Sequence, residues 1–266
     1  YYNIADYSLW DFTTALADLH AGLLRFIGEP EMRCREDAVR MLRAVRFAAK
    51  LDLYLDPATE AAIYRCGHLL RHIAPARLFD EAIKLFHTGN GRSAFELLHR
   101  FALFSWLFPA TAAALEELAT HRQFLLIALE NTDARVNAAK PVNPAFLYAA
   151  LLWPPVMQLS QGIAAEEELE VNVALPIAGS QILEAQMHHT AMPRRYLVQV
   201  KEIWGLQARF ERRRGPRAQR LLGHPRFRAA YDFFCLRAQA GEVEQAACDW
   251  WTALQSSHAT ERATER

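Results

Sequence analysis

The strongest constraint on the fold is the segment from Arg35 to Phe47, REDAVRMLRAVRF, in which an arginine occurs at every third position from Arg40 onward. At about 100° per residue, one arc of a helix collects the apolar side chains Val39, Leu42, Val45 and Ala49. The opposite arc collects the charged side chains Asp37, Arg40, Arg43 and Arg46. The pattern therefore predicts one amphipathic helix from Glu29 to Lys50, with a packed face and a charged face.

The charged face is open to two interpretations. A row of arginines is suited to binding an anion, because each guanidinium presents a fork of donors that matches a phosphate. Asp37 and Arg40 are one helical turn apart, so an acceptor and a donor fork together could bond the edge of a nucleobase. The alternative is a solvated helix face, whose ion pairs contribute only about 0.2 to 0.5 kcal/mol each.

The residues around this segment resemble a known family. The run DLHAGLLRFIGEPEMRCREDAVRMLRAVRFAAKL is similar to the junction between head and neck in the bacterial poly(A) polymerases and the related CCA-adding tRNA nucleotidyltransferases. The residues that match the pattern of this family are Asp18, Leu19, Arg25, Gly28, Pro30, Glu36, Asp37, Arg40, Arg43, Arg46 and Phe47. The resemblance implies a nucleotide site made of Glu36, Asp37, Arg40, Arg43 and Arg46, with ATP as the substrate.

Two positions depart from the family pattern. Ala38 stands where the family usually has a proline after Glu-Asp, which should loosen the start of the helix slightly without moving Asp37. Thr14 and Ala15 replace a Gly-Gly pair at the hinge between head and neck. If those glycines adopt a positive φ, we expect Thr14 to be strained there.

The resemblance also predicts that part of the family's chain lies outside this sequence. Family members hold two catalytic Mg²⁺ ions on two Asp residues that follow a Gly-Ser loop. The one Gly-Ser pair here, Gly179-Ser180, is followed by QILEAQ and offers no Asp. We therefore expect no catalytic and no metal-binding residue in this chain, with Mg²⁺ bound by a head domain that the sequence lacks. A start at Tyr1, inside a strand-like pattern, indicates a piece of a longer protein.

Residues 1–28 are predicted to be the C-terminal end of a nucleotidyltransferase head domain. The run YYNIADYSLWDF predicts two short strands joined by a turn. A helix from Thr13 or Thr14 to His20 and a short strand from Leu23 to Ile27 follow. Three short strands do not form a stable sheet alone, so we expect a small β remnant of a nucleotidyltransferase head domain.

Helices dominate the rest, which makes the predicted fold mainly α: a helical neck (29–110), a body with an arginine-rich region (111–240), and a C-terminal helix with a disordered tail (241–266). In the neck and at its end we expect helices at Ala58–Arg71, from Pro75 to a cap at Gly89, and at Arg92–Leu107, closed by Pro109. In the body we expect helices at Ala112–Glu130, Pro144–Trp153, Val156–Val173 and Ser180–Met187. The acidic run from Glu166 to Glu170 is expected on a solvated helix face.

The C-terminal third carries a strong local charge. Residues 193–237 contain twelve Arg or Lys and three Asp or Glu, although the whole chain has thirty of each class. The predicted RNA-binding residues are Arg209, Arg212, Arg213, Arg214, Arg217, Arg220, Arg226 and Arg228. These arginines alternate with Phe210, Phe227, Tyr231 and Phe233, a mixture that single-stranded RNA binding uses. The alternative is that the rings belong to the core and that only the arginines face outward.

Other features of the sequence indicate the cellular compartment of the protein. Residues 142–159 are uncharged, but Pro154 and Pro155 favour a buried helix ending at Trp153 over a membrane span. The start lacks a signal peptide pattern. The cysteines, Cys34, Cys66, Cys235 and Cys248, are widely spaced and contain no Cys-x-x-Cys pair, which favours a reducing compartment. Together these features predict a cytoplasmic protein.

The resemblance implies part of a polynucleotide adenylyltransferase that adds AMP from ATP to RNA 3′ ends, as in RNA polyadenylation and decay. The arginine-rich C-terminal part favours a poly(A) polymerase over a CCA-adding tRNA nucleotidyltransferase. The alternative from another class is a non-catalytic helical adapter that binds RNA. Partners implied by the resemblance are the RNA 3′ end, ATP, and an RNA helicase or the RNA-degradation machinery.

Overall fold

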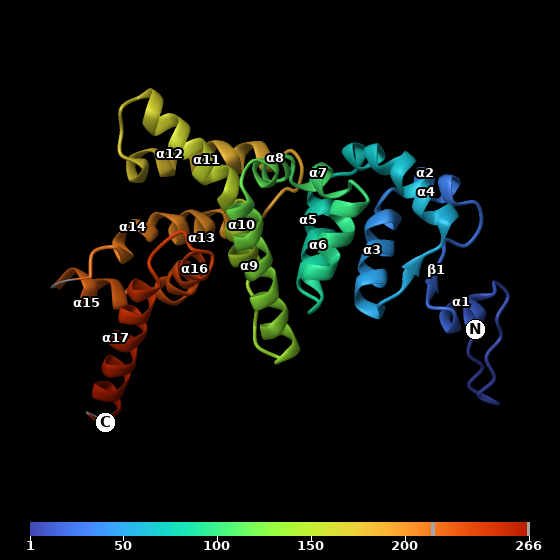
Figure 1. Cartoon of the computed structure of the whole chain (residues 1–266). Coiled ribbons are helices and arrows are strands. Elements are labelled where there is room, and N and C mark those ends of the chain that lie inside the picture. Colours follow the sequence, from blue (N-terminus) through green and yellow to red (C-terminus); the bar gives the residue numbers. More distant parts are fainter. Residues whose placement is uncertain (214–215, 265–266) are drawn as a thin grey trace.

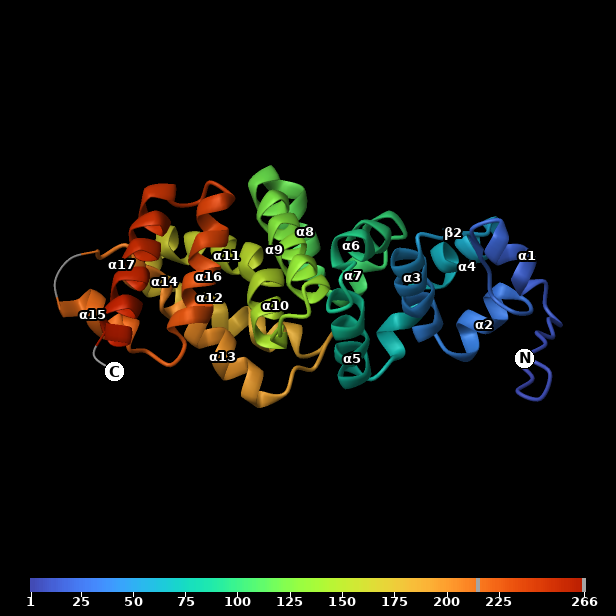
Figure 2. The same ribbon diagram turned by 90° about the horizontal axis from the view of Figure 1, so that it is seen from below.

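The computed structural model describes residues 1–213 and 216–264, and side chains up to residue 257. Its elements follow one another along an elongated arch, with the two termini at opposite ends (Figure 1). The view from below shows the same order, from α1 at one end to α15 and α17 at the other (Figure 2). The mainly α fold predicted from the sequence is confirmed.

The first 28 residues form a small, largely exposed unit. Tyr2 and Leu9 make an antiparallel bridge, as expected for two short strands joined by a turn. Helix α1 (Ala15–His20) is followed by strand β1 (Leu23–Leu24), which is shorter than predicted. Strand β1 pairs in parallel with β2 (Tyr54–Leu55), a strand that the sequence did not indicate.

The hinge position behaves as expected. Thr14 precedes α1 with a φ of 64°, in the left-handed region that disfavours a β-branched residue. Its side chain makes no capping hydrogen bond. After the helix, Arg25 holds Asp18 with two hydrogen bonds of 2.6 and 2.9 Å, so these two residues of the family pattern form one forked ion pair.

The single helix predicted from Glu29 to Lys50 is wrong, because the chain forms α2 (Pro30–Glu36) and α3 (Val39–Leu51) with a break between them. Asp37 at the break is extended, with φ −154° and ψ 101°. Its carboxylate accepts a hydrogen bond from the backbone N–H of Val39 at 3.2 Å. Asp competes in this way with helical bonding inside a helix, which explains why the periodic pattern continues while the helix does not.

The neck continues with helices that pack on α2 and α3. They are α4 (Pro57–Cys66), α5 (Pro75–Phe86) and α6 (Gly91–Arg100), and a 3-10 turn (Gly67–His72) follows α4. Gly89, between α5 and α6, has a φ of 84°, as a C-terminal cap requires. The helix predicted from Arg92 to Leu107 divides instead at Ala102, whose φ is 54°, and α7 (Phe104–Leu107) follows.

In the body, the first turns of two helices contain prolines that the sequence analysis had placed after or between helices. Pro109 opens α8 (Pro109–Glu117), and Pro154 and Pro155 lie in the first turn of α11 (Trp153–Glu166). The remaining body helices are α9 (Ala119–Asn137), α10 (Pro144–Leu151) and α12 (Val171–Gln186). The acidic run lies largely in the exposed turn between α11 and α12, which corrects its assignment to a helix face. Among the described helices, none is long and apolar enough to cross a membrane.

The C-terminal region builds a second core. Helices α13 (Arg194–Gly205) and α16 (Phe227–Gln239) also touch the main core, which begins at Cys34 in the neck. Short helices α14 (Gln207–Phe210) and α15 (Pro216–Leu222) and the long α17 (Gln245–Thr264) complete the smaller core around Trp251. Residues 258–264 continue α17, where the sequence predicted a disordered tail.

Candidate nucleotide and RNA interface

The apolar arc of α3 packs into the neck as predicted. Val39, Leu42 and Val45 are fully buried, and Ala49 is half-buried against the same core. Met41, Ala44 and Ala48 are buried too, so the buried face is wider than the sequence indicated. This packing fixes α3 and leaves its arginines at the surface or half-buried.

Asp37 and Arg40 are each held by another residue of the chain. The Oδ2 atom of Asp37 accepts a hydrogen bond from Arg77 of α5 at 2.7 Å. Arg40 donates to Glu36 at 2.6 Å and to the backbone carbonyl of Arg33 at 3.2 Å. The hydrogen bond from Arg40 is the main cause that lowers the pKa of the Glu36 carboxyl below its usual value. Asp37 and Arg40 thus lie one turn apart at the start of α3, joined by a backbone hydrogen bond of 3.0 Å, and each side chain bonds to a different residue.

Arg43 and Arg46 share a buried carboxylate. Glu81 of α5 is 3% exposed, and its oxygens lie 3.9 Å from Nε of Arg43 and 3.8 Å from a terminal nitrogen of Arg46. Lys84 donates a closer bond of 2.9 Å to the same carboxylate. Within the described residues, Oε2 of Glu81 has no hydrogen-bond partner. The buried carboxylate of Glu81 on α5 thus lies close to both Arg43 and Arg46 of α3.

Arg77 and Glu81 are functional candidates that the sequence analysis missed. They lie one turn apart on α5, and one contacts Asp37 while the other contacts the two arginines. A signal for Glu81 exists in the sequence, because it shares the core-facing side of α5 with Leu78, Ala82 and Leu85. A charged residue at such a position is rarely buried without partners.

The C-terminal arginines are held far more loosely. Arg209, Arg212, Arg217 and Arg220 are exposed, and none has an ion pair within the described part of the chain. The other described members pair with carboxylates: Arg213 with Glu244 at 3.4 Å, Arg226 with Glu202 at 2.8 Å and Arg228 with Asp232 at 3.0 Å. Arg214 lies outside the described residues. Most of the positive charge of this region is therefore free to meet a polyanion.

The aromatic rings of this region are not available for stacking on bases. Phe210 and Phe233 are fully buried, and Phe227 and Tyr231 are 6% and 8% exposed. Phe210 stacks on Phe234 with ring centroids 5.1 Å apart, inside the second core. The interpretation that these rings read bases is wrong, and the alternative, that they are core, is confirmed.

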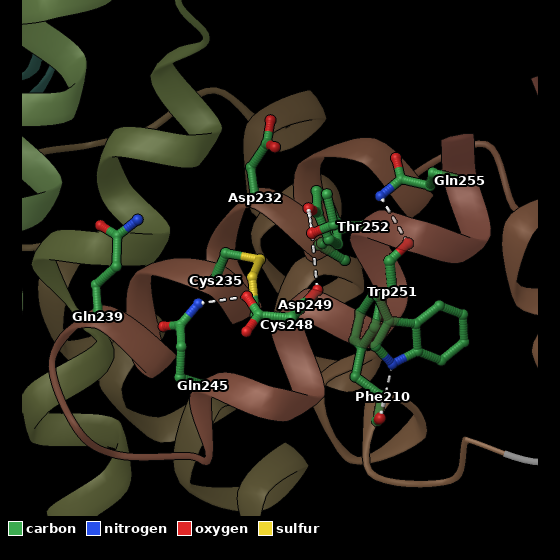
Figure 3. Close-up of a disulfide and its surroundings, with 12 residues drawn as sticks. Phe210, Asp232, Cys235, Gln239, Gln245, Cys248, Asp249, Trp251, Thr252 and Gln255 are labelled. Atoms are coloured by element: carbon green, nitrogen blue, oxygen red, sulfur yellow. Dashed lines mark hydrogen bonds between the residues drawn. A yellow bond between two sulfur atoms is a disulfide. The ribbon is translucent and has the colours of Figure 1, made fainter. Parts of the chain in front are cut away.

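The cysteines divide into two pairs. Cys235 of α16 and Cys248 of α17 form a disulfide across the two helices, a pairing that the sequence analysis did not foresee (Figure 3). Cys34 and Cys66 are buried thiols, and burial is the main cause that raises the pKa of Cys34 to about 12. In the described residues no group of three or more His, Cys, Asp or Glu could hold a metal ion.

Comparison with known proteins decides the family. One family model, described as "Probable RNA and SrmB- binding site of polymerase A", matches residues 52–115. Another, "Polymerase A arginine-rich C-terminus", matches residues 167–266. Poly(A) polymerase I of Salmonella typhimurium is 42% identical over 262 residues, which are 97% of this chain and 56% of that relative. The chain belongs to the bacterial poly(A) polymerase family.

Other relatives are more distant. The CCA-adding enzyme of Anoxybacillus flavithermus is 38% identical over 121 residues, 46% of this chain and 30% of that relative. A structure titled "Thermotoga maritima CCA-adding enzyme complexed with tRNA_CCA" superimposes with a TM-score of 0.51 at 16% identity, covering 91% of this chain and 50% of the other. This likeness concerns the fold. The poly(A) polymerase assignment fits the whole chain, and the CCA-adding alternative fits it less well.

The relatives at about 42% identity are named Poly(A) polymerase I, a name that agrees with the enzyme class predicted from the sequence. The chain spans 56% of the length of the Salmonella typhimurium relative. The residues predicted to bind nucleotide and RNA remain predictions after these comparisons.

Proposed function

We propose that this chain supplies the nucleotide-reading neck and the RNA-holding body of a polynucleotide adenylyltransferase, which adds AMP from ATP to RNA 3′ ends. The observation that carries the proposal is the cluster at the junction of α2, α3 and α5. There Asp37, Arg40, Arg43 and Arg46 lie together, each bonded or close to a charged side chain of the chain.

In this proposal Asp37 and Arg40 bond the edge of the adenine. Adenine presents an amino donor beside a ring nitrogen acceptor, which complements a carboxylate beside a guanidinium. Glu36 keeps Arg40 in place through the 2.6 Å bond. Arg43 and Arg46 then meet the phosphates of ATP, because Glu81 holds both guanidinium groups near one point. Ligand binding has to share or replace the bond between Arg77 and Asp37.

RNA binding is assigned to the neck, the body and the arginine-rich region. The match of residues 52–115 to a model described by RNA binding supports RNA contacts in the neck. The exposure of Arg209, Arg212, Arg217 and Arg220 supports them in the arginine-rich region. The predicted partners beyond RNA and ATP, an RNA helicase or the RNA-degradation machinery, and the cytoplasmic location stay predictions.

Mg²⁺ belongs to the proposed reaction, but no step through it is derived from this chain, because the described residues contain no cluster of three or more His, Cys, Asp or Glu side chains. Metal ions activate the attacking hydroxyl and neutralise the leaving pyrophosphate in such reactions. The part played by this chain is therefore binding and selection.

A pair of activity measurements tests the proposal. The chain alone should not extend RNA with ATP, whereas a fusion with the remaining part of the Salmonella typhimurium relative should extend it. Extension is followed on a labelled RNA with free 3′ ends, and the unfused relative part is the control. A fusion that is folded yet adds no AMP would contradict the proposal, and so would extension by the purified chain alone.

A further inference from the structure

The body contains a cleft of about 720 Å³ that the nucleotide site does not explain. Side chains from α9, α10, α13, α16 and α17 line it, together with the loop between α9 and α10. Figure 3 shows one wall, where Asp232, Gln239, Gln245 and Asp249 surround the disulfide between α16 and α17. The volume falls in the range of roughly 300 to 1,000 Å³ that holds organic ligands, so the cleft is too large for a lone ion.

The charge of the cleft favours an anion. Its basic lining residues are Arg135, Lys140, Arg226 and Arg228, and its acidic ones are Asp232 and Asp249. His87 also lines the cleft, but burial lowers its pKa to about 4, so the ring is neutral at ordinary pH. Arg226 is paired with Glu202 outside the lining and Arg228 with Asp232. Arg135 and Lys140 therefore leave a small excess of positive charge over Asp249.

The uncharged part of the lining favours a ligand with bases as well as phosphates. Five amide side chains face the cleft: Asn131, Asn143, Gln199, Gln239 and Gln245. Two pairs of them are bonded across helices, Asn131 to Gln239 at 3.2 Å and Asn143 to Gln199 at 2.9 Å. Each amide offers both a donor and an acceptor, as base edges require, and Asn and Gln pair well with adenine. Inorganic phosphate can accept from the amide N–H groups, but it offers few donors for their carbonyl oxygens.

One carboxylate of the lining, Asp232, already pairs with an arginine. Asp232 binds Arg228 at 3.0 Å, and burial is the main cause that raises the pKa of this carboxyl. Arg228 is 71% exposed and Arg135 is exposed as well, so both can turn toward an incoming phosphodiester. Because Arg226 and Arg228 also belong to the arginine-rich region, the cleft continues that surface into the body.

We propose that this cleft holds a short stretch of single-stranded RNA, with Arg135, Lys140 and Arg228 on its phosphates and the amides on its bases. The inference rests on the proposed RNA binding of the chain and names where in the body a strand lies. Asp232 limits the affinity, because it neutralises Arg228 when no strand is present.

The test compares variants that should act in opposite directions. In the double variant Arg135→Ala, Lys140→Ala, oligoadenylate should bind about 25-fold more weakly near 0.1 M salt, because each lost phosphate contact costs about fivefold there. The slope of log K against log salt should become shallower by about 1.4 units. Asp232→Asn should instead bind about fivefold more tightly, since it frees Arg228 for a phosphate.

Two controls keep the result clear. Lys201→Ala removes one positive charge from α13 outside the cleft and should leave the affinity nearly unchanged. Lys140→Ala alone covers the case in which the double variant unfolds, because the Lys140 side chain is exposed and makes no bond within the described residues. Its expected loss is about fivefold.

Each outcome has a meaning. If oligoadenylate does not bind the unaltered chain, the proposed RNA binding fails and the cleft proposal falls with it. If the chain binds RNA and all cleft variants bind it equally well, or if Asp232→Asn weakens binding, only the cleft proposal is overturned. Competition by free ATP at the cleft, abolished by Lys140→Ala, would reassign it to a mononucleotide and would also overturn the proposal.

Discussion

The arginines of the neck and those of the C-terminal region differ in what holds them. In the neck, Arg40 is bonded to Glu36, and Arg43 and Arg46 share the buried Glu81. Arg209, Arg212, Arg217 and Arg220 in the C-terminal region are exposed and have no carboxylate partner in the described part of the chain. The same residue type thus occurs in one fixed and one loose arrangement.

The difference has a physical consequence. A guanidinium held in place loses little conformational freedom on binding and can favour one ligand geometry over another. A loose, solvated guanidinium still attracts phosphates and releases counterions, but it does not read a sequence. We therefore expect selectivity from the neck and salt-dependent affinity from the C-terminal region.

The largest expected effect is on RNA affinity. Replacing Arg212, Arg217 and Arg220 by Ala should weaken binding to oligoadenylate and to mixed-sequence RNA alike, by about 100-fold near 0.1 M salt. The salt slope should become shallower by about 2 units. Fluorescence anisotropy titrations at several salt concentrations measure both quantities.

The matched set for this experiment is the neck. Replacing Arg40, Arg43 and Arg46 by Ala removes the same charge, yet it should reduce RNA affinity by less than about tenfold. A neck variant that loses more RNA affinity than the C-terminal variant would reverse the comparison.

A smaller effect is expected on stability when the support of the neck is removed. Glu81→Gln keeps the shape of the side chain but deletes the charge that Arg43, Arg46 and Lys84 share. The free energy of unfolding should fall by about 1 to 2 kcal/mol, because the partly buried Arg46 and the half-exposed Arg43 and Lys84 lose a buried charge that they face. ATP affinity should fall with it, while RNA affinity stays.

Glu96 is the matched control for Glu81. It pairs with Arg92 at 3.1 Å, but its side chain is 50% exposed. Glu96→Gln should change stability by less than about 0.5 kcal/mol. Equal losses of unfolding free energy in the two variants would mean that the burial of Glu81 does not increase its contribution to stability. Urea denaturation of each variant decides between the two results.

The smallest expected effect is a pH dependence of stability, caused by His87 at the end of α5. Burial lowers the pKa of His87, the residue after this helix, to about 4, whereas the unfolded value is about 6.5. The neutral ring is stabilising above the unfolded pKa, and this contribution is lost as the pH falls toward the folded pKa. Near pH 5.5 the chain should be less stable by about 1 kcal/mol than near pH 7.5.

His87→Gln should remove that part of the pH dependence, and His68→Gln serves as the matched control. His68 is exposed on the neck. Denaturation curves at both pH values give the difference for each variant. If His87→Gln and the unaltered chain lose equal stability on acidification, His87 contributes nothing to it.

The sequence predicted the features that depend on local periodicity and failed where distant residues decide. The buried arc of α3 follows from the spacing of Val39, Leu42 and Val45 alone. The break at Asp37 accompanies a bond to Arg77, forty residues away, which no local pattern contains. The strand at Tyr54 and Leu55 exists through its pairing with β1.

The same limit applies to the C-terminal region. The excess of arginine was visible in the sequence, but the burial of Phe210, Phe227 and Tyr231 requires the packing of α14, α16 and α17. The bond between Cys235 and Cys248 depends on the contact of α16 with α17 and could not be predicted from spacing. A cluster of charges can be recognised in the sequence alone, whereas the burial of an aromatic ring depends on how the helices pack.

The most direct test measures nucleotide choice and RNA salt dependence in the same two variants, using the active fusion described above. Arg40→Ala should reduce the preference for ATP over CTP by about 1 to 3 kcal/mol and leave the salt slope unchanged. The Arg212, Arg217 and Arg220 triple variant should make the slope shallower by about 2 units and leave the preference unchanged. If either variant changed both quantities, or if Arg40→Ala left the preference intact, the division of roles between neck and C-terminal region would be contradicted.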